Sequence, residues 1–298
     1  MNYKSILGLA LIGGFVFLLY FPVFIWLIHA WQGNPSFNHG FFILPISAFL
    51  IWRRRKELTS GDSSPLGFLI LALGLMLYIW GFLKHFHFLT ALSLLPVSWG
   101  LILYFGGKKA AWLSIFPIAF LIFMIPPPFL NELSSFLQSL TTLWSAEALK
   151  RLGISVSTTG AQIQLPNSNF FIGLPCSGIN ALISLLVITA LFGYLLKGEV
   201  WRRIILFLLA FPIAIFANLA RIISLLLIGY RWGTRIALIY FHSYFDLMFY
   251  FIALLSLGLI AWLLGCRLTN NVTAHTCYSE PPDSSGSHFG TIYRGKNL

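Results

Sequence analysis

Residues 174–196 read LPCSGINALISLLVITALFGYLL, in which a cysteine and two small residues are followed by an apolar run long enough to cross a membrane. Similar runs recur between residues 6 and 264, and the chain is 58% hydrophobic and only 9% charged. A length of 298 residues would allow one or two soluble domains. Repeated apolar runs instead indicate one bundle with several membrane spans. We therefore predict an all-α polytopic membrane protein.

The basic residues gather in short clusters between the apolar runs. A net charge of +11 would by itself suit nucleic acid, but basic clusters beside membrane spans follow from the positive-inside rule. We therefore predict no nucleic-acid partner. With residues 53–56, 108–109 and 197–203 on the cytoplasmic side, the chain crosses the cytoplasmic (inner) membrane about eight times, with both termini cytoplasmic. The predicted spans are residues 6–28, 41–52, 65–83, 88–105, 111–125, 176–196, 204–228 and 244–264, the first being too long for a signal peptide and therefore a retained anchor.

The longest non-membrane stretch inside the bundle is an extracytoplasmic insertion at about residues 126–174. Residues 129–152 have helical periodicity, which predicts a helix that lies on the membrane surface or caps the bundle. Ile154 and Val156, and then Ile163 and Leu165, alternate with polar residues around Gly160, which predicts a small β-hairpin. We predict an integral membrane domain at residues 1–265, a loop at residues 229–243, and a polar, disordered cytoplasmic tail at residues 266–298.

Cys176 is the first candidate for chemistry. Pro175 suits the first turn of a helix, which would place Cys176 at a helix N-terminus, where free backbone N–H groups and the helix dipole favour a thiolate. The small neighbours Ser177 and Gly178 support this interpretation. The alternative is that Cys176 is a small apolar residue that only packs.

Arg221 is the second candidate. An arginine in an apolar helix costs about 2.5–3.5 kcal/mol on insertion scales, so it is expected to face a polar cavity or a partner. Snorkelling to lipid phosphates is the alternative. Asn218 lies three residues earlier on the same helical face and can line the same pocket. The arginine could bind a carboxylate or a peptide carbonyl, or stabilise an oxyanion.

His242 is the third candidate, and the predicted topology places it on the same outer boundary as Cys176 and Arg221. An imidazole there could take the proton of a thiol, or it could be a hydrogen-bonded surface residue. Asp246 could orient His242 or simply complement a helix N-terminus. His39 could line the pocket or stabilise a turn.

No metal or cofactor site is predicted. The three cysteines show no metal-binding spacing, and His85 and His87 lack nearby cysteines or carboxylates. The sequence contains no P-loop, no dinucleotide fingerprint and no His-Glu-x-x-His zinc motif.

Taken together, three ordered motifs resemble the exosortase/archaeosortase family. They are Pro175-Cys176-Ser177-Gly178-Ile179, Asn218-Leu219-Ala220-Arg221-Ile222 and His242, and the resemblance also covers Asn38-His39-Gly40 and extends over about residues 38–264. One position departs from the family pattern, which often has glycine four residues after the histidine, where this chain has Asp246.

The resemblance implies a membrane-embedded cysteine transpeptidase or protease. Such enzymes act on exported proteins that end in a Pro-Glu-Pro-type motif, a transmembrane helix and a basic tail, and they pass the acyl group to an acceptor nucleophile at the outer face. By position, Cys176 would be the nucleophile, Arg221 the substrate or transition-state stabiliser and His242 the proton-transfer residue. The implied partners are such exported proteins, membrane lipid and the acceptor.

Two other function classes stay open at this point. A transporter or channel would need polar residues spread through the spans, whereas the candidates here gather at one face. A membrane acyltransferase or an assembly factor for envelope polysaccharide export would act without cutting a peptide.

Overall fold

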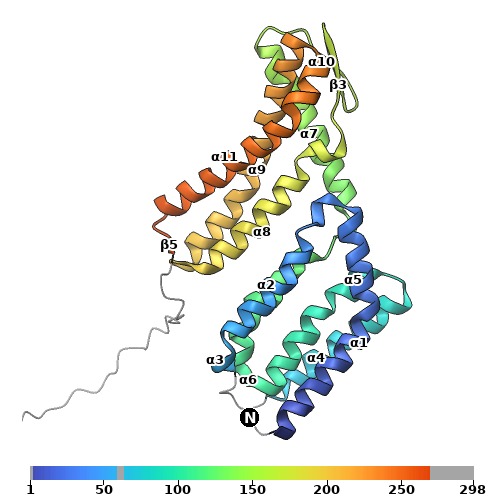
Figure 1. Ribbon diagram of the computed structural model, residues 1–298, viewed down its shortest axis with the longest axis vertical. Helices are drawn as coiled ribbons and strands as arrows, with labels where there is room; N and C mark the ends of the chain where they lie inside the picture. The colour runs from blue at the N-terminus through green and yellow to red at the C-terminus, as the bar shows by residue number, and fades with distance from the viewer. Residues whose placement is uncertain (1–2, 59–63, 269–298) are drawn as a thin grey trace, which may run out of the picture. The chain divides into compact units, whose positions relative to one another are not determined.

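The computed structural model describes residues 3–58 and 64–268, and this part of the chain is mainly helical (Figure 1). The predicted tail, apart from its first three residues, lies outside the described residues. The first half contains helices α1 (Tyr3–Gly33), α2 (Gly40–Arg53), α3 (Arg55–Leu58), α4 (Leu66–Leu83), α5 (His87–Leu92) and α6 (Leu94–Phe120), with short 3-10 turns η1 (Pro35–Phe37) and η2 (Leu121–Met124).

The second half begins with α7 (Leu130–Arg151) and three short strands, β1 (Ser157–Thr159), β2 (Gln162–Leu165) and β3 (Ser168–Phe171). A 3-10 turn, η3 (Leu174–Ser177), then leads into α8 (Ile179–Leu195), which lies beside α9 (Val200–Trp232) and α11 (His242–Leu263) (Figure 1). The elements between and after these helices are β4 (Leu196–Lys197), α10 (Thr234–Ile236), the π-helical turn η4 (Ala237–Phe241) and β5 (Arg267–Leu268).

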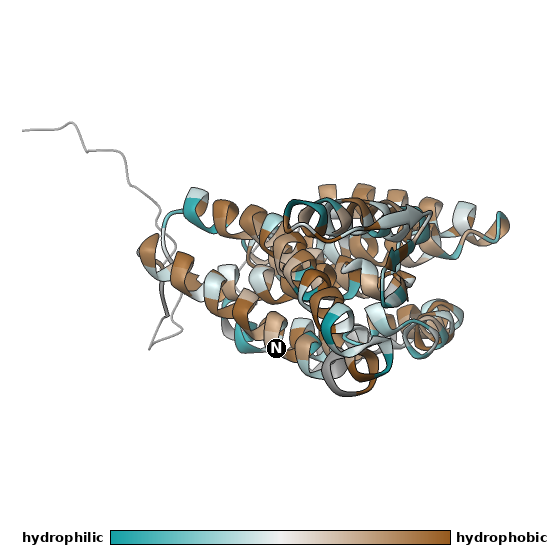
Figure 2. Ribbon diagram, turned by 90° about the horizontal axis from the view of Figure 1, so that it is seen from above, coloured by the Kyte–Doolittle hydropathy of each residue, from teal (hydrophilic) through white to brown (hydrophobic). Residues whose placement is uncertain are grey.

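Five helical stretches of the described chain are long and apolar enough to cross a membrane. They are Ile12–Gly33, Leu66–Leu83, His87–Met124, Val200–Trp232 and Tyr244–Leu263, and Ile179–Leu195 is a shorter apolar helix. Apolar residues dominate the helices, as the brown ribbon in Figure 2 shows. The chain is therefore a polytopic α-helical membrane protein.

The count of eight spans stays a prediction. Length alone gives five, because α8 has only 17 residues and because of two further features. The predicted second span corresponds to α2, which has only 14 residues. The predicted fourth and fifth spans form one continuous helical stretch that is broken at Gly107, where φ is +75°. A positive φ is accessible to glycine at little cost, so this residue marks the turn between the two halves.

Helix α4 packs closely against α5 and α6 through glycines spaced by seven residues: Gly67, Gly74 and Gly81. A Cβ on Gly74 would lie 2.8 Å from Val97 Cγ2, and one on Gly81 would lie 2.7 Å from Thr90 Oγ1. Small residues let helix backbones approach where lipid tails offer no hydrophobic driving force between helices. The spacing therefore defines the packing face of α4.

Helices α2 and α8 run in the same direction. At their beginnings, Ser36 in η1 donates a hydrogen bond to the side chain of Asn180. At their ends, the guanidinium of Arg54 lies 5.4 Å from the ring centre of Tyr194. The predicted topology requires α2 and α8 to run in the same direction, because in that topology both spans run from the outer face to the cytoplasm.

The insertion contains a three-stranded antiparallel sheet in the order β1-β2-β3. The chain reverses at Gly160, but Ile154 and Val156 precede β1, and the third strand was not predicted. The apolar face of the sheet packs on α9, where the Phe170 ring lies directly against Gly229. The sheet thus packs against the C-terminal half of α9.

The prediction of a loop at residues 229–243 is wrong. Helix α9 continues to Trp232, Gly233 interrupts it with φ of +90°, and α10 and η4 then lead directly into α11. Ala237 is fully buried in the same cluster as Ile222 and Leu226. This buried contact keeps the connection helical, because burial against α9 favours a regular, internally hydrogen-bonded backbone.

Candidate active site

A cleft of about 460 Å³ lies between α8, α9 and α11. Two of the three residues singled out for chemistry, Cys176 and Arg221, line it together with Asn218 and Asp246. Its remaining walls are mainly apolar, with polar groups from Asn180, Ser184 and Tyr250. A largely apolar cleft with a few convergent polar groups is the usual form of a ligand site.

Cys176 lies in the 3-10 turn η3, and not in the first turn of α8. Its backbone N–H donates to the carbonyl of Gly173 at 2.9 Å. Gly178 follows in the left-handed conformation with φ of +90°, and α8 begins only at Ile179. The predicted helix start is therefore three residues too early, because the left-handed glycine separates the cysteine from the helix. Cys176 is partly exposed at the cleft.

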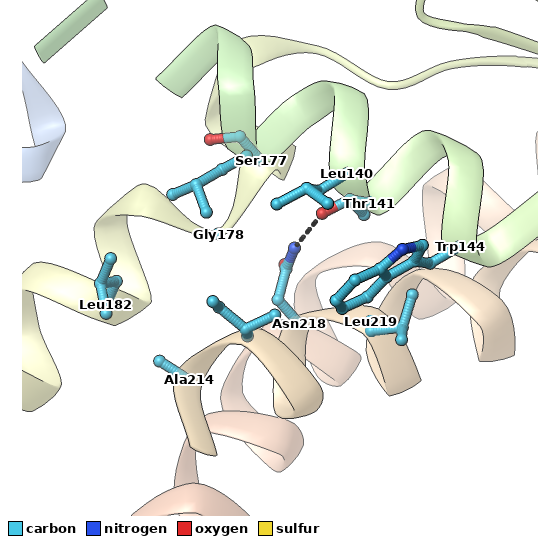
Figure 3. A pocket seen from close by; sticks show the side chains of 11 residues that line it. Leu140, Thr141, Trp144, Ser177, Gly178, Leu182, Ala214, Asn218 and Leu219 are labelled. Carbon is cyan, nitrogen blue, oxygen red and sulfur yellow. Dashed lines mark hydrogen bonds between the residues drawn. The ribbon is translucent and has the colours of Figure 1, made fainter. Parts of the chain in front are cut away.

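Asn218 holds the turn that carries Cys176. Its side-chain Nδ2 lies 3.3 Å from the carbonyl oxygen of Cys176 and 3.3 Å from Thr141 Oγ1 of α7, and it donates toward both. The second contact is the dashed line in Figure 3, where the Asn218 amide reaches from α9 toward α7 beside Gly178. Asn218 is 5% exposed. One amide thus joins the cysteine turn, α7 and α9.

Helix α7 supplies further support that the sequence analysis missed. Ser134 shares a hydrogen bond of 3.1 Å with Ser177, and Gln138 donates to the carbonyl of Ile172. One face of helix α7 carries the polar residues Ser134, Gln138, Thr141 and Ser145, which are three or four positions apart. Three of them, Ser134, Thr141 and Ser145, are buried, while Phe136 and Leu143 of the same helix are exposed. This polar face was the available signal, because small polar residues that recur at helical spacing in an apolar protein indicate an interhelical contact.

Arg221 forms an ion pair with Asp246. Its Nη1 lies 2.8 Å from Asp246 Oδ1, with 12% of the arginine side chain and 43% of the aspartate side chain exposed. Arg221 was predicted to face a cavity or a partner, and it does both. Asp246, which could orient His242 or complement a helix N-terminus, forms an ion pair with Arg221 of α9.

His242 is the first residue of α11, one helical turn before Asp246. Its side chain lies outside the part of the chain that the structure describes. The backbone nevertheless places it at the end of α11 nearest to the Arg221–Asp246 pair.

His39 does not line the cleft. Its Nε2 lies 3.1 Å from the carbonyl oxygen of Phe123, so it joins the start of α2 to η2. Burial lowers the pKa of His39 below its usual value, although backbone hydrogen bonds to Phe123 and Ser36 oppose this shift. The residue that reaches α8 from this loop is Ser36, through its bond to Asn180.

The described residues contain no cluster of three or more histidine, cysteine or acidic side chains that could hold a metal ion. The polar groups that line the cleft are a thiol, a guanidinium, a carboxylate, amides and hydroxyls. A thiol together with a cationic hydrogen-bond donor can support thiol-dependent acyl transfer.

A comparison with protein-family models finds a match to the transmembrane exosortase model over residues 31–265. The chain belongs to the transmembrane exosortase family. The match confirms the family that the motifs around Cys176, Arg221 and His242 indicate, and it includes all three residues. Searches of curated proteins and of solved structures found no match. The matched exosortase region begins at Trp31, whose indole N–H donates to the carbonyl of Met124 at 2.7 Å.

Proposed function

We propose that this exosortase-family chain is a membrane-embedded cysteine peptidase or transpeptidase with Cys176 as its nucleophile. The observation that carries the proposal is that Cys176 and Arg221, 45 positions apart in the sequence, line the same cleft. A thiol and a guanidinium that line one cleft supply the two groups that acyl transfer needs, a nucleophile and a stabiliser of developing negative charge.

In the proposed reaction, the Cys176 thiol loses its proton to His242 and attacks the carbonyl carbon of the scissile peptide bond. The carbonyl electron pair moves to oxygen, and Arg221 stabilises the resulting oxyanion. When the tetrahedral intermediate collapses, the C–N bond breaks and the departing amine takes the proton from His242. An acceptor amine or water then attacks the thioester and regenerates the thiol.

The proposed substrate is an exported protein with a C-terminal sorting signal made of a Pro-Glu-Pro-type motif, a transmembrane helix and a basic tail. Two features support a substrate that is itself anchored in the membrane. The cleft lies between three apolar helices, so a substrate helix can pack beside them in lipid. The basic residues Arg53, Arg54 and Arg55 lie where α2 ends and α3 begins, opposite the end of α2 at which Ser36 meets Asn180 near Cys176.

With these basic residues in the cytoplasm, Cys176 would lie at the outer face of the inner membrane. Both termini would then be cytoplasmic. A cysteine at the outer boundary meets the substrate motif where the exported polypeptide emerges from the membrane.

The test uses a tagged reporter protein that ends in the tripartite signal, co-expressed with the wild-type chain, with Cys176→Ala or with Cys266→Ala. Cys266 is a matched control because it is buried at the far end of α11, against Gly198. We expect the wild type and Cys266→Ala to shorten the reporter and Cys176→Ala to leave it intact. Unchanged processing by Cys176→Ala would exclude Cys176 as the nucleophile.

A further inference from the structure

The Arg221–Asp246 ion pair joins α9 to α11 at the cleft. The contact is direct, at 2.8 Å between Arg221 Nη1 and Asp246 Oδ1. Among the described residues that line the cleft, Arg221 is the one base and Asp246 the one acid. Within the ion pair the two opposite charges offset each other, and Asp246 holds the Arg221 guanidinium near α11.

The two partners differ in exposure, and this difference suggests which one serves the other. Arg221 is 12% exposed, so without a counter-charge it would hold a positive charge in an apolar surrounding. Asp246 is 43% exposed, so water solvates part of its carboxylate. Arg221 therefore needs a negative counter-charge, and Asp246 supplies that charge.

Because a guanidinium is planar and rigid, the contact with Asp246 also orients the Arg221 side chain. The contact is an ion pair, and the charge of the carboxylate beside Nη1 limits where the rigid, planar guanidinium group can lie. Arg221 also lines the cleft, where its guanidinium can stabilise a substrate carbonyl oxygen that gains negative charge.

We propose that Asp246 is a positioning residue that holds the Arg221 guanidinium in the orientation that stabilises the oxyanion. This inference rests on the proposed function of Arg221 in acyl transfer. Asp246 itself touches neither the thiol nor the scissile bond in this scheme. Its effect passes through Arg221, so it should alter the rate of the chemical step far more than the binding of substrate.

The experiment measures initial cleavage rates of the tagged reporter by the full-length chain in membranes, for the wild type and for Asp246→Ala, Asp246→Asn and Glu147→Ala. Asp246→Ala should lower kcat by about 100-fold, the loss expected when a catalytic group moves by about 1 Å, with KM nearly unchanged. Asp246→Asn keeps an oxygen acceptor without the charge and should lose less. Glu147→Ala is the matched control, because it removes the acid of an exposed ion pair with Arg151 and should cleave at the wild-type rate.

Two further measurements separate positioning from a merely structural role. Sodium formate should partly restore cleavage by Asp246→Ala, because a small carboxylate can enter the vacated space beside Arg221, whereas sodium chloride at equal ionic strength should not. The double variant Arg221→Ala with Asp246→Ala should be no slower than Arg221→Ala alone, because a residue that acts through Arg221 has no effect once Arg221 is gone.

The outcomes distinguish this inference from the proposed function. If Cys176→Ala still cleaves the reporter, the proposed function fails and the inference fails with it. If cleavage needs Cys176 but Asp246→Ala and Asp246→Asn cleave at the wild-type rate, only the positioning role is overturned. It is also overturned if formate has no effect and the losses in the double variant multiply. Should Asp246→Ala fail to accumulate, Asp246→Asn carries the same double-variant comparison.

Discussion

The backbone of Gly178 lies directly against the side chain of Asn218. A Cβ on Gly178 would lie 2.7 Å from Asn218 Cγ and 2.8 Å from its Nδ2, and φ of Gly178 is +90°. The same amide donates to the carbonyl of Cys176. The shape of the cysteine turn therefore depends on a residue without a side chain, two positions after the thiol.

Gly178→Ala should therefore destabilise the protein and slow the reaction. The backbone strain alone costs about 1–3 kcal/mol, and displacement of Asn218 adds to it. Gly153→Ala is the matched control, because Gly153 has φ of +81° but a Cβ there would meet nothing within 4 Å. The unfolding temperature in detergent and the rate of reporter cleavage should both fall more for Gly178→Ala than for Gly153→Ala. Equal losses in the two variants would contradict a specific Gly178–Asn218 contact.

Thr141→Val should slow cleavage, because it removes the α7 partner of Asn218 and leaves one amide hydrogen without its acceptor, a loss of about 1–3 kcal/mol in stability. Thr142→Val is the control. Its hydroxyl is also buried, but it bonds to the carbonyl of Gln138 in the same helix. The comparison is made by reporter cleavage and by thermal unfolding. A Thr142→Val variant as impaired as Thr141→Val would rule out a special role for the α7–α9 link.

The space around each glycine predicts opposite effects for two glycine-to-alanine changes, one in α4 and one in α11. Gly74→Ala should lower the unfolding temperature, because the new methyl group would overlap Val97 of α6. Gly258→Ala lies in α11, where a Cβ would meet nothing within 4 Å, so it should raise stability by up to about 1 kcal/mol through helix propensity. Thermal unfolding of both variants in the same detergent checks this. A stabilised Gly74→Ala would show that α4 and α6 do not pack through this face.

The lowered pKa of His39 predicts a pH dependence of stability. The unfolded chain takes up a proton near the usual histidine value of 6.5, whereas folded His39 does so only at lower pH. The unfolded state therefore binds more protons, and the contribution of His39 is lost as the pH falls from 6.5 through the folded-state pKa. Unfolding temperatures of the wild type and of His39→Gln, measured from neutral to acidic pH, should show a flatter dependence for the variant. Parallel curves would contradict this assignment.

The sequence predicted the features that depend on composition and on order along the chain. Apolar runs predicted a polytopic helical membrane protein, and the motifs around Cys176 and Arg221 identified the family and two residues of the cleft. Basic clusters predicted that α2 and α8 run in the same direction, which the contacts of Ser36 and Arg54 match.

The sequence did not predict features that depend on how one helix is rotated against another. Arg221 and Asp246 were each recognised, but their ion pair depends on the rotation of α9 relative to α11, which helical periodicity alone does not give. The contact between Thr141 and Asn218 was missed for the same reason. The start of α8 was placed too early because a glycine that follows a proline turn can either continue a helix or adopt the left-handed conformation, and Gly178 does the latter.

The most direct test of the central claim is mass spectrometry of the acyl-enzyme. The wild-type chain is mixed with the tagged reporter, the reaction is stopped with acid, and the peptide that contains Cys176 is analysed. We predict a thioester between Cys176 and the newly formed C-terminus of the reporter, absent from Cys176→Ala and released by hydroxylamine. A lipid on Cys176 would indicate an acyltransferase, and an unmodified cysteine in a preparation that cleaves the reporter would contradict the thioester mechanism.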